Sequence, residues 1–157
     1  MPATLFEAFK NLESELNDKI PMPRPVSLYP KHPDYVEGDS PDAFPYLALF
    51  YASETPNYGP GSDIHWVKPS MELAVLRVYA VVGEDTQIIP GYAEGALGLN
   101  TMALVQEVRK VVRDITRNAG SLGYRMAVTG VTTDYDPANR WGWSSIDVTV
   151  GAYEFAE

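Results

Sequence analysis

Cysteine is absent from this chain of 157 residues, and the only histidines are His32 and His65. The missing thiols exclude disulfide bonds and thiolate metal sites. A histidine-centred acid–base site needs an orienting partner, and the spacing around the two histidines indicates none. The chain also lacks the run of about eighteen apolar residues that a membrane span requires. Its first residues lack the basic start and apolar core of a signal peptide, so we expect no leader.

Basic residues are also scarce, because 12 Lys and Arg accompany 21 Asp and Glu and give a net charge of −9. Sequence-independent binding of nucleic acid needs Lys and Arg to neutralise phosphates, so this balance argues against it. It remains compatible with enclosing DNA, since an acidic wall repels the phosphate backbone and lets DNA slide. Hydrophobic residues make up 45% of the chain, which favours a globular protein. The length favours a single domain over residues 1–157.

Hydrophobic spacing predicts two amphipathic helices. The first, Leu5–Asp18, follows a capping box that begins at Thr4. The second, Thr101–Asn118, has Asn100 or Thr101 as its N-cap. The apolar stripes are Leu5, Phe9, Leu12 and Leu16 in the first helix, with Phe6 beside them, and Leu104, Val108, Val111 and Ile115 in the second.

Four strands flank the second helix, two on each side. Arg77 interrupts the most apolar strand, which we expect to be central and covered on both faces, so Arg77 needs a partner or an exposed rim. Gly130 predicts a bulge, and Asp134–Trp143 is the expected hairpin loop. The last strand alternates, so one face is core and the other meets water or a partner. The expected strands are Tyr46–Tyr51, Met71–Val82, Met126–Thr133 and Ser145–Phe155.

This order of elements predicts an α+β fold. A mixed, mostly antiparallel sheet packs against one long helix, with an N-terminal helix and long proline-rich loops. Prolines cluster in Pro21–Pro45, where Val26–Tyr29 is a candidate edge strand. This segment is either an arm that reaches a neighbouring subunit or a loop that wraps its own domain, and both remain open. Ser53–Pro69 is a second long loop.

Two clusters near the last strand are candidate sites. Asp134 and Asp136 offer oxygen ligands for a hard cation, with Asn139 close by, but a polar turn explains them better. Trp141 and Trp143 fall on the same side of the chain. We interpret them first as a subunit anchor or a lid over the core, and second, with Tyr135, as a stacking platform for a sugar or base.

The order helix, proline-rich loop, two strands, long helix and hairpin resembles the tail-terminator and tail-completion (neck) proteins of long-tailed bacteriophages. The C-terminal pattern carries the rest of the resemblance: Leu99–Ile115 as the helix, Gly130-Val131-Thr132-Thr133-Asp134-Tyr135, and a tryptophan-bearing turn into Ile146-Asp147-Val148-Thr149-Val150. It implies a homohexameric ring that ends tail-tube polymerisation and joins the tail to the head–tail connector.

The partners implied are further copies of the chain, the tail-tube protein and the connector protein. DNA would pass through the ring without specific binding, and the protein would reside in the virion tail or neck after assembly in the host cytoplasm. The resemblance implies no enzymatic activity, cofactor or metal. It identifies no interface residues.

Interface candidates therefore come from the chain itself. They lie in the Pro21–Pro45 arm, the Ser53–Pro69 loop, the central strand, the start of the last strand and its end. The candidates are Tyr29, Tyr35, Tyr58, His65, Trp66, Arg77, Trp141, Trp143, Tyr153 and Phe155.

Two other functions compete with the ring. One is a small metal-dependent enzyme or metal-binding domain that uses Asp134, Asp136 and His65. The other is a ligand-binding module that uses Trp141, Trp143 and Tyr135 as its stacking surface.

Overall fold

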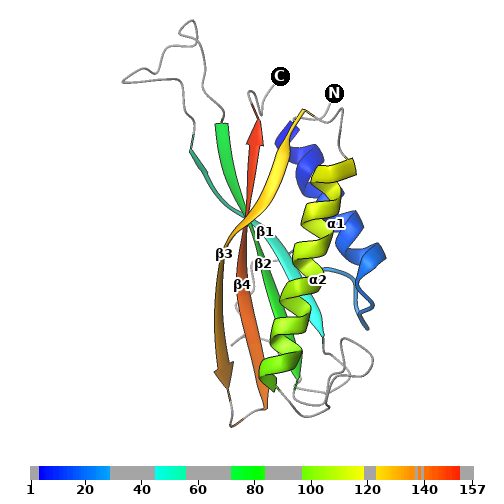
Figure 1. Ribbon diagram of the computed structural model, residues 1–157, viewed down its shortest axis with the longest axis vertical. Coiled ribbons are helices and arrows are strands. Elements are labelled where there is room, and N and C mark those ends of the chain that lie inside the picture. Colours follow the sequence, from blue (N-terminus) through cyan, green and yellow to red (C-terminus); the bar gives the residue numbers. More distant parts are fainter. Residues whose placement is uncertain are drawn as a thin grey trace, which may run out of the picture.

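A computed structural model (Figure 1) describes residues 4–28, 45–55, 72–83, 97–118, 123–136, 138 and 140–152. Two helices and four strands occupy these ranges. In chain order they are α1 (Thr4–Lys19), β1 (Tyr46–Thr55), β2 (Glu72–Gly83), α2 (Leu97–Asn118), β3 (Arg125–Asp136) and β4 (Trp141–Ala152). The predicted α+β class is confirmed.

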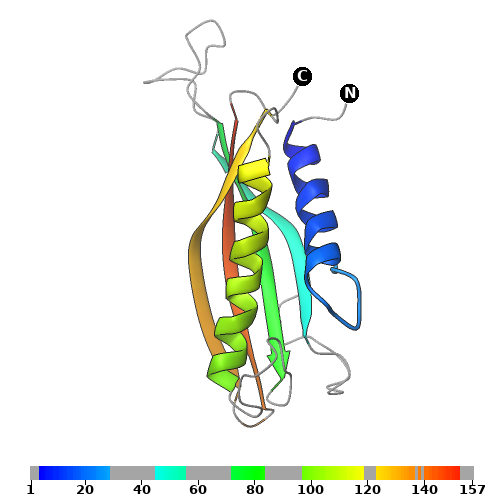
Figure 2. The same ribbon diagram turned by 45° about the vertical axis from the view of Figure 1, so that its right-hand side comes forward.

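The four strands form one antiparallel sheet in the order β1-β2-β4-β3. The strands β2 and β4 are central, while β1 and β3 are the edges. Both helices lie on the same face of the sheet, as Figures 1 and 2 show. Among the described residues, no helix covers the opposite face, which we call the outer face.

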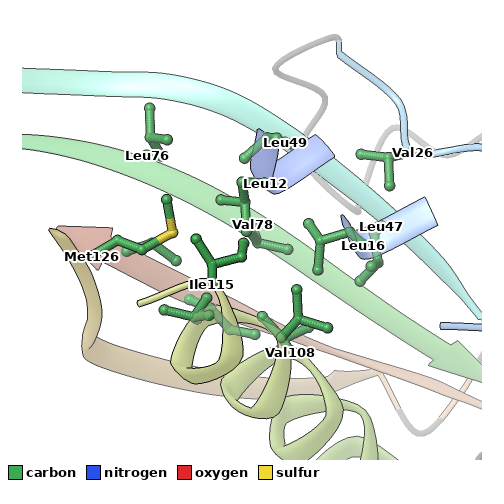
Figure 3. Close-up of a cluster of buried hydrophobic side chains, with 14 of the residues drawn as sticks. Leu12, Leu16, Val26, Leu47, Leu49, Leu76, Val78, Val108, Ile115 and Met126 are labelled. Atoms are coloured by element: carbon green, nitrogen blue, oxygen red, sulfur yellow. The ribbon is translucent and has the colours of Figure 1, made fainter. Parts of the chain in front are cut away.

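The core lies between the sheet and the two helices (Figure 3). Leu12 and Leu16 of α1 are fully buried, as predicted from the helical stripe. The alternation of apolar residues in β4 arises because every second residue of a strand faces the helices. Core side chains from α2 and the sheet include Leu104, Val108, Ile115, Leu76, Val78, Ile146 and Val148.

Hydrogen bonds fix α1 and the chain after it against the sheet. Asn11 Nδ2 of α1 donates to the hydroxyl of Tyr124, over 2.8 Å, just before β3. Ser27 forms a single parallel bridge to β1, with its amide donating to Leu47 and its carbonyl accepting from Leu49. The expected edge strand Val26–Tyr29 is therefore reduced to one bridge, and Tyr29 lies outside the described residues.

The start of α2 differs from the prediction. The helix begins at Leu97, so Asn100 ends its first turn, Thr101 begins the second, and both are buried. The Thr101 hydroxyl donates over 2.7 Å to the Leu97 carbonyl one turn earlier. The prediction that Asn100 or Thr101 caps the helix was wrong, because both residues pack inside it.

The hairpin is also tighter than expected. β3 continues to Asp136 and β4 begins at Trp141, so most of the predicted loop Asp134–Trp143 belongs to the strands. Arg140 completes the turn with a φ of 59°, in the left-handed region. The predicted bulge at Gly130 is confirmed by a register shift between Val128 and Gly130.

Candidate functional site

The outer face is the largest surface of the sheet that the described helices leave open. Strand register places paired residues on the same face, so its members follow from the pairing with β2. Leu73 on this face is 40% exposed, whereas Val81 is fully buried. The expectation that β2 is covered on both faces therefore holds for only part of the strand. The outer-face residues used below are Tyr46, Phe50, Leu73, Arg77, Tyr79, Trp141, Trp143, Asp147 and Thr149.

An ion pair occupies the middle of the outer face. Arg77 on β2 lies directly opposite Asp147 on β4, and its Nε donates to Asp147 Oδ1 over 2.9 Å. This hydrogen bond raises the pKa of Arg77 above its ordinary value, so the guanidinium stays charged. The side chains are 35% and 37% exposed, and an ion pair in such contact with water adds little stability. The predicted need of Arg77 for a partner is confirmed.

Aromatic and hydroxyl groups surround this pair. The rings of Phe50 and Tyr79 lie 5.3 Å apart at a tilt of 47°. The Thr129 hydroxyl, carried by the β3 bulge, lies 2.7 Å from the Thr149 hydroxyl of β4. The outer face thus combines apolar, aromatic and polar groups in the way that protein interfaces do.

Trp141 and Trp143 lie together on the outer face, as predicted. Their ring centroids are 5.6 Å apart, Trp141 is only 5% exposed and Trp143 is half-buried. Tyr135 pairs with Gly142, so it lies on the helix side of the sheet. The stacking platform of Trp141, Trp143 and Tyr135 was therefore wrong, because strand alternation separates Tyr135 from the tryptophans. The burial of Trp141 agrees with a lid or anchor.

Tyr46 stands at the edge of the outer face, opposite Val81. Its hydroxyl oxygen is buried and has no hydrogen-bond partner in the part of the chain that the structure describes. Burial, and then the proximity of Tyr79, raise the pKa of Tyr46 from 10.0 to about 12. Burial without a partner costs a hydroxyl about 1–3 kcal/mol, so this group is a local weakness.

We expect Tyr46→Phe to stabilise the protein at neutral pH by up to about 1 kcal/mol, because it removes the buried hydroxyl. The pKa of Tyr46 in the folded state is above the unfolded value of 10.0. The wild-type protein therefore keeps its full free energy of unfolding below pH 10 and loses part of it as the pH rises towards 12 and Tyr46 ionises. The gap between variant and wild type should therefore widen by up to about 2 kcal/mol over that range, after screening by solvent. Urea unfolding at several pH values measures it.

Tyr51→Phe is the control for this experiment, since Tyr51 is 50% exposed and hydrogen-bonds to Glu54. The difference in the free energy of unfolding between Tyr51→Phe and the wild type should change much less with pH. A Tyr46→Phe variant that tracks the wild type between pH 10 and pH 12 would contradict the assignment of the shift to Tyr46.

The candidate cation ligands do not form a cluster. Asp134 and Asp136 pair with Trp143 and Trp141, so both lie on the outer face, and Asp134 Oδ1 accepts from the Tyr135 amide over 2.8 Å. Within the described ranges, no three His, Asp or Glu side chains group as metal ligands. Asn139 and His65 lie outside those ranges.

Most of the other interface candidates also lie outside the described residues: Tyr29, Tyr35, Tyr58, His65, Trp66, Tyr153 and Phe155. Of the ten, Arg77, Trp141 and Trp143 are described, and all three share the outer face. Sequence reasoning missed the contribution of Phe50, Tyr79 and Thr129. Grouping Phe50 with Arg77 requires the register of β1 against β2, which the alternation within each strand does not supply.

A scan against known protein families found no match to this sequence, and neither did a search of the curated proteins. Neither helix in the described part is both long and apolar enough to cross a bilayer.

Proposed function

We propose that this protein is a structural subunit of a bacteriophage tail, which assembles into a ring at the head-proximal end of the tail tube. The observation that carries the proposal is the element order α1-β1-β2-α2-β3-β4. That order, with a long helix between two strand pairs and a closing hairpin, is the one on which the resemblance to tail-terminator and tail-completion proteins rests. In this role a hexameric ring ends tube polymerisation and joins the tail to the connector.

The outer face supports an assembly role. Two helices cover one side of the sheet, while the other side presents Leu73, the aromatic pair of Phe50 and Tyr79, and the Arg77–Asp147 ion pair. A closed ring forms by a head-to-tail contact, in which each copy uses two different surfaces. The outer face is well suited to be one of these.

Charge fits the same proposal. With a net charge of −9, a ring of this chain repels DNA that moves through its lumen and does not retain it. The partners are then further copies of the chain, the tail-tube protein and the connector protein, and the location is the virion tail or neck. A metal-dependent activity at Asp134 and Asp136 gains no support, because no third ligand joins them among the described residues.

The ring is tested first by the mass of the purified full-length protein. Sedimentation velocity and native mass spectrometry should give one closed oligomer, and negative-stain microscopy should reveal rings. Addition of tail-tube protein from the same phage should place the ring at one end of the tube and halt its growth. A chain that stays monomeric, with the tube lengthening unchanged in its presence, would contradict the proposal.

Leu73→Glu tests the outer face within this proposal. Leu73 is 40% exposed on this face, so a charge there should leave the monomer folded and abolish the ring. Phe6→Glu is the matched control, because Phe6 of α1 is 56% exposed on the other side of the protein. Loss of the ring in both variants, or in neither, would remove the outer face from the assembly.

A further inference from the structure

A groove of about 480 Å³ runs between α2 and β3. Its helix side carries Arg109, Lys110, Arg113 and Arg117, and its strand side carries Met126 and Val128. Four of the 12 basic residues of an acidic chain therefore line one groove. This concentration requires an explanation, because the overall charge is −9.

Three of these cations have no counter-ion among the described residues. Arg109, Arg113 and Arg117 follow one another at four-residue intervals, so they form a single stripe on α2, and all three are exposed. Lys110 has Glu107 at 3.7 Å, but no ion pair joins the three arginines to any other described residue. Like charges at this spacing destabilise a helix by about 0.2–0.5 kcal/mol per pair. The stripe is thus unfavourable in the isolated subunit and becomes favourable beside an anion.

The strand side of the groove is a sheet edge. β3 pairs only with β4 in the described sheet. At the start of this edge the Thr116 hydroxyl donates to the Met126 carbonyl over 2.7 Å and accepts from the Met126 amide over 3.3 Å. Both backbone groups of Met126 are therefore already hydrogen-bonded. The groove borders this edge at Met126, Ala127 and Val128, and no described strand lies beside it there. Such an edge receives extended segments of other chains.

We propose that this groove binds the acidic segment of residues 29–44 from a second copy of the chain. This inference rests on the proposed function, because a ring needs one repeated contact between neighbouring copies. The segment carries Asp34, Glu37, Asp39 and Asp42 against a single Lys31, so its charge is opposite to that of the groove. It is also rich in proline, which favours the extended conformation that a groove beside a strand edge accepts.

The spacing of the charges agrees as well. Arginines four residues apart on a helix are separated by about 6 Å along the axis, since each residue rises about 1.5 Å. Two residues of an extended β-strand span about 6.6 Å, and residues i and i+2 point to the same face. Glu37 and Asp39 can therefore meet Arg113 and Arg117 in register, which gives the contact its specificity.

Zero-length carbodiimide coupling tests the contact in the full-length protein, because it joins a lysine amine to a carboxylate with which it is in contact. Equal amounts of isotope-labelled and unlabelled chains are mixed before coupling, so about half of the peptides joined between copies pair a labelled with an unlabelled chain, which peptides joined within one copy never do. We expect mixed-label peptides that join Lys110 to the acidic residues of the 29–44 segment. The Lys10–Glu13 pair, at 3.6 Å within α1, is the internal control for the reaction.

The outcomes separate this inference from the ring. A ring in which Lys110 couples only within its own chain, or not to the 29–44 segment, overturns the groove contact and leaves the ring standing. Mixed-label Lys110 links in an open or dimeric assembly support the groove contact and contradict the ring.

Charge reversal gives a second, independent test. Arg113→Glu with Arg117→Glu should weaken self-association by at least about tenfold, because two favourable ion pairs become repulsive. Adding Glu37→Arg and Asp39→Arg to the same chain should restore it. Lys19→Glu with Arg24→Glu is the matched control, since it makes the same charge change at two exposed residues outside the groove.

Sedimentation velocity at moderate salt measures both effects. Equal weakening by the control variant, or no recovery in the four-fold variant, overturns the proposal. If short duplex DNA binds the wild type but not Arg113→Glu/Arg117→Glu, and the four-fold variant does not recover, the groove is a nucleic-acid surface and the proposal fails.

Discussion

Leu12→Ala is expected to lower the free energy of unfolding by about 2–5 kcal/mol, the largest effect anticipated for a single residue in this fold. Leu12 is fully buried in the cluster that joins α1 to α2 and the sheet (Figure 3). Its truncation loses the free energy gained by burying the leucine side chain, and it also leaves a cavity, because close-packed neighbours relax only in part. Urea denaturation followed by circular dichroism measures the change.

Phe6→Ala on the same helix is the control. Phe6 is 56% exposed, so its loss should change the free energy of unfolding by no more than about 0.5 kcal/mol. If the two alanine variants were equally stable, α1 would be a peripheral helix whose packing against α2 contributes little. The comparison also separates Leu12, a member of the predicted stripe of α1, from Phe6, which was predicted to lie beside that stripe.

The sequence predicted the layers of the fold because periodicity is a local signal. The stripes of α1 and α2 identified Leu12 and Leu104 as core, and the alternation of β4 identified Ile146, Val148 and Val150, all of which are buried. These patterns depend only on 3.6-residue and two-residue repeats, so they need no knowledge of the partner element.

The ends of the elements were less predictable. Asp134-Tyr135-Asp136 has the composition of a turn, yet pairing with β4 extends the strand through it. Likewise, the first turn of α2 contains Gly98, which weakens a helix. The Tyr135 side chain lies close to this turn and packs against it. In both places contacts distant in sequence outweighed local preference.

The site was predictable only in fragments. The sequence indicated that Arg77 needs a partner, but identification of Asp147 required the register of β2 against β4. Tyr135 was wrongly grouped with the tryptophans because the sequence placed it in a loop, whereas its pairing with Gly142 puts it on the opposite face of the sheet. The four-residue spacing of Arg109, Arg113 and Arg117 was visible in the chain, but the open edge of β3 beside it was not.

Gly142→Ala should destabilise the protein by about 1–3 kcal/mol, because a methyl group must enter an occupied space. A Cβ at Gly142 would lie 2.8 Å from Cδ1 of Tyr135 and 3.2 Å from the Thr101 hydroxyl oxygen. Thr101 is held by its bond to the Leu97 carbonyl. The strain is relieved only if the Tyr135 ring leaves its position over Gly142, with loss of its packing at the start of α2.

Gly130→Ala is the matched control, because among the described residues a Cβ there would meet only Asp147, whose Oδ2 lies at an ordinary contact distance of 3.6 Å. It should therefore cost less than Gly142→Ala. Tyr135→Ala supplies the second arm of a double-mutant cycle, in which the cost of Gly142→Ala should fall once the ring is gone. Thermal and urea unfolding of the four chains measures the coupling. A cost of Gly142→Ala that persists without the ring would assign the strain to the backbone, and the closeness of Tyr135 to Gly142 would not be the reason for glycine at this position.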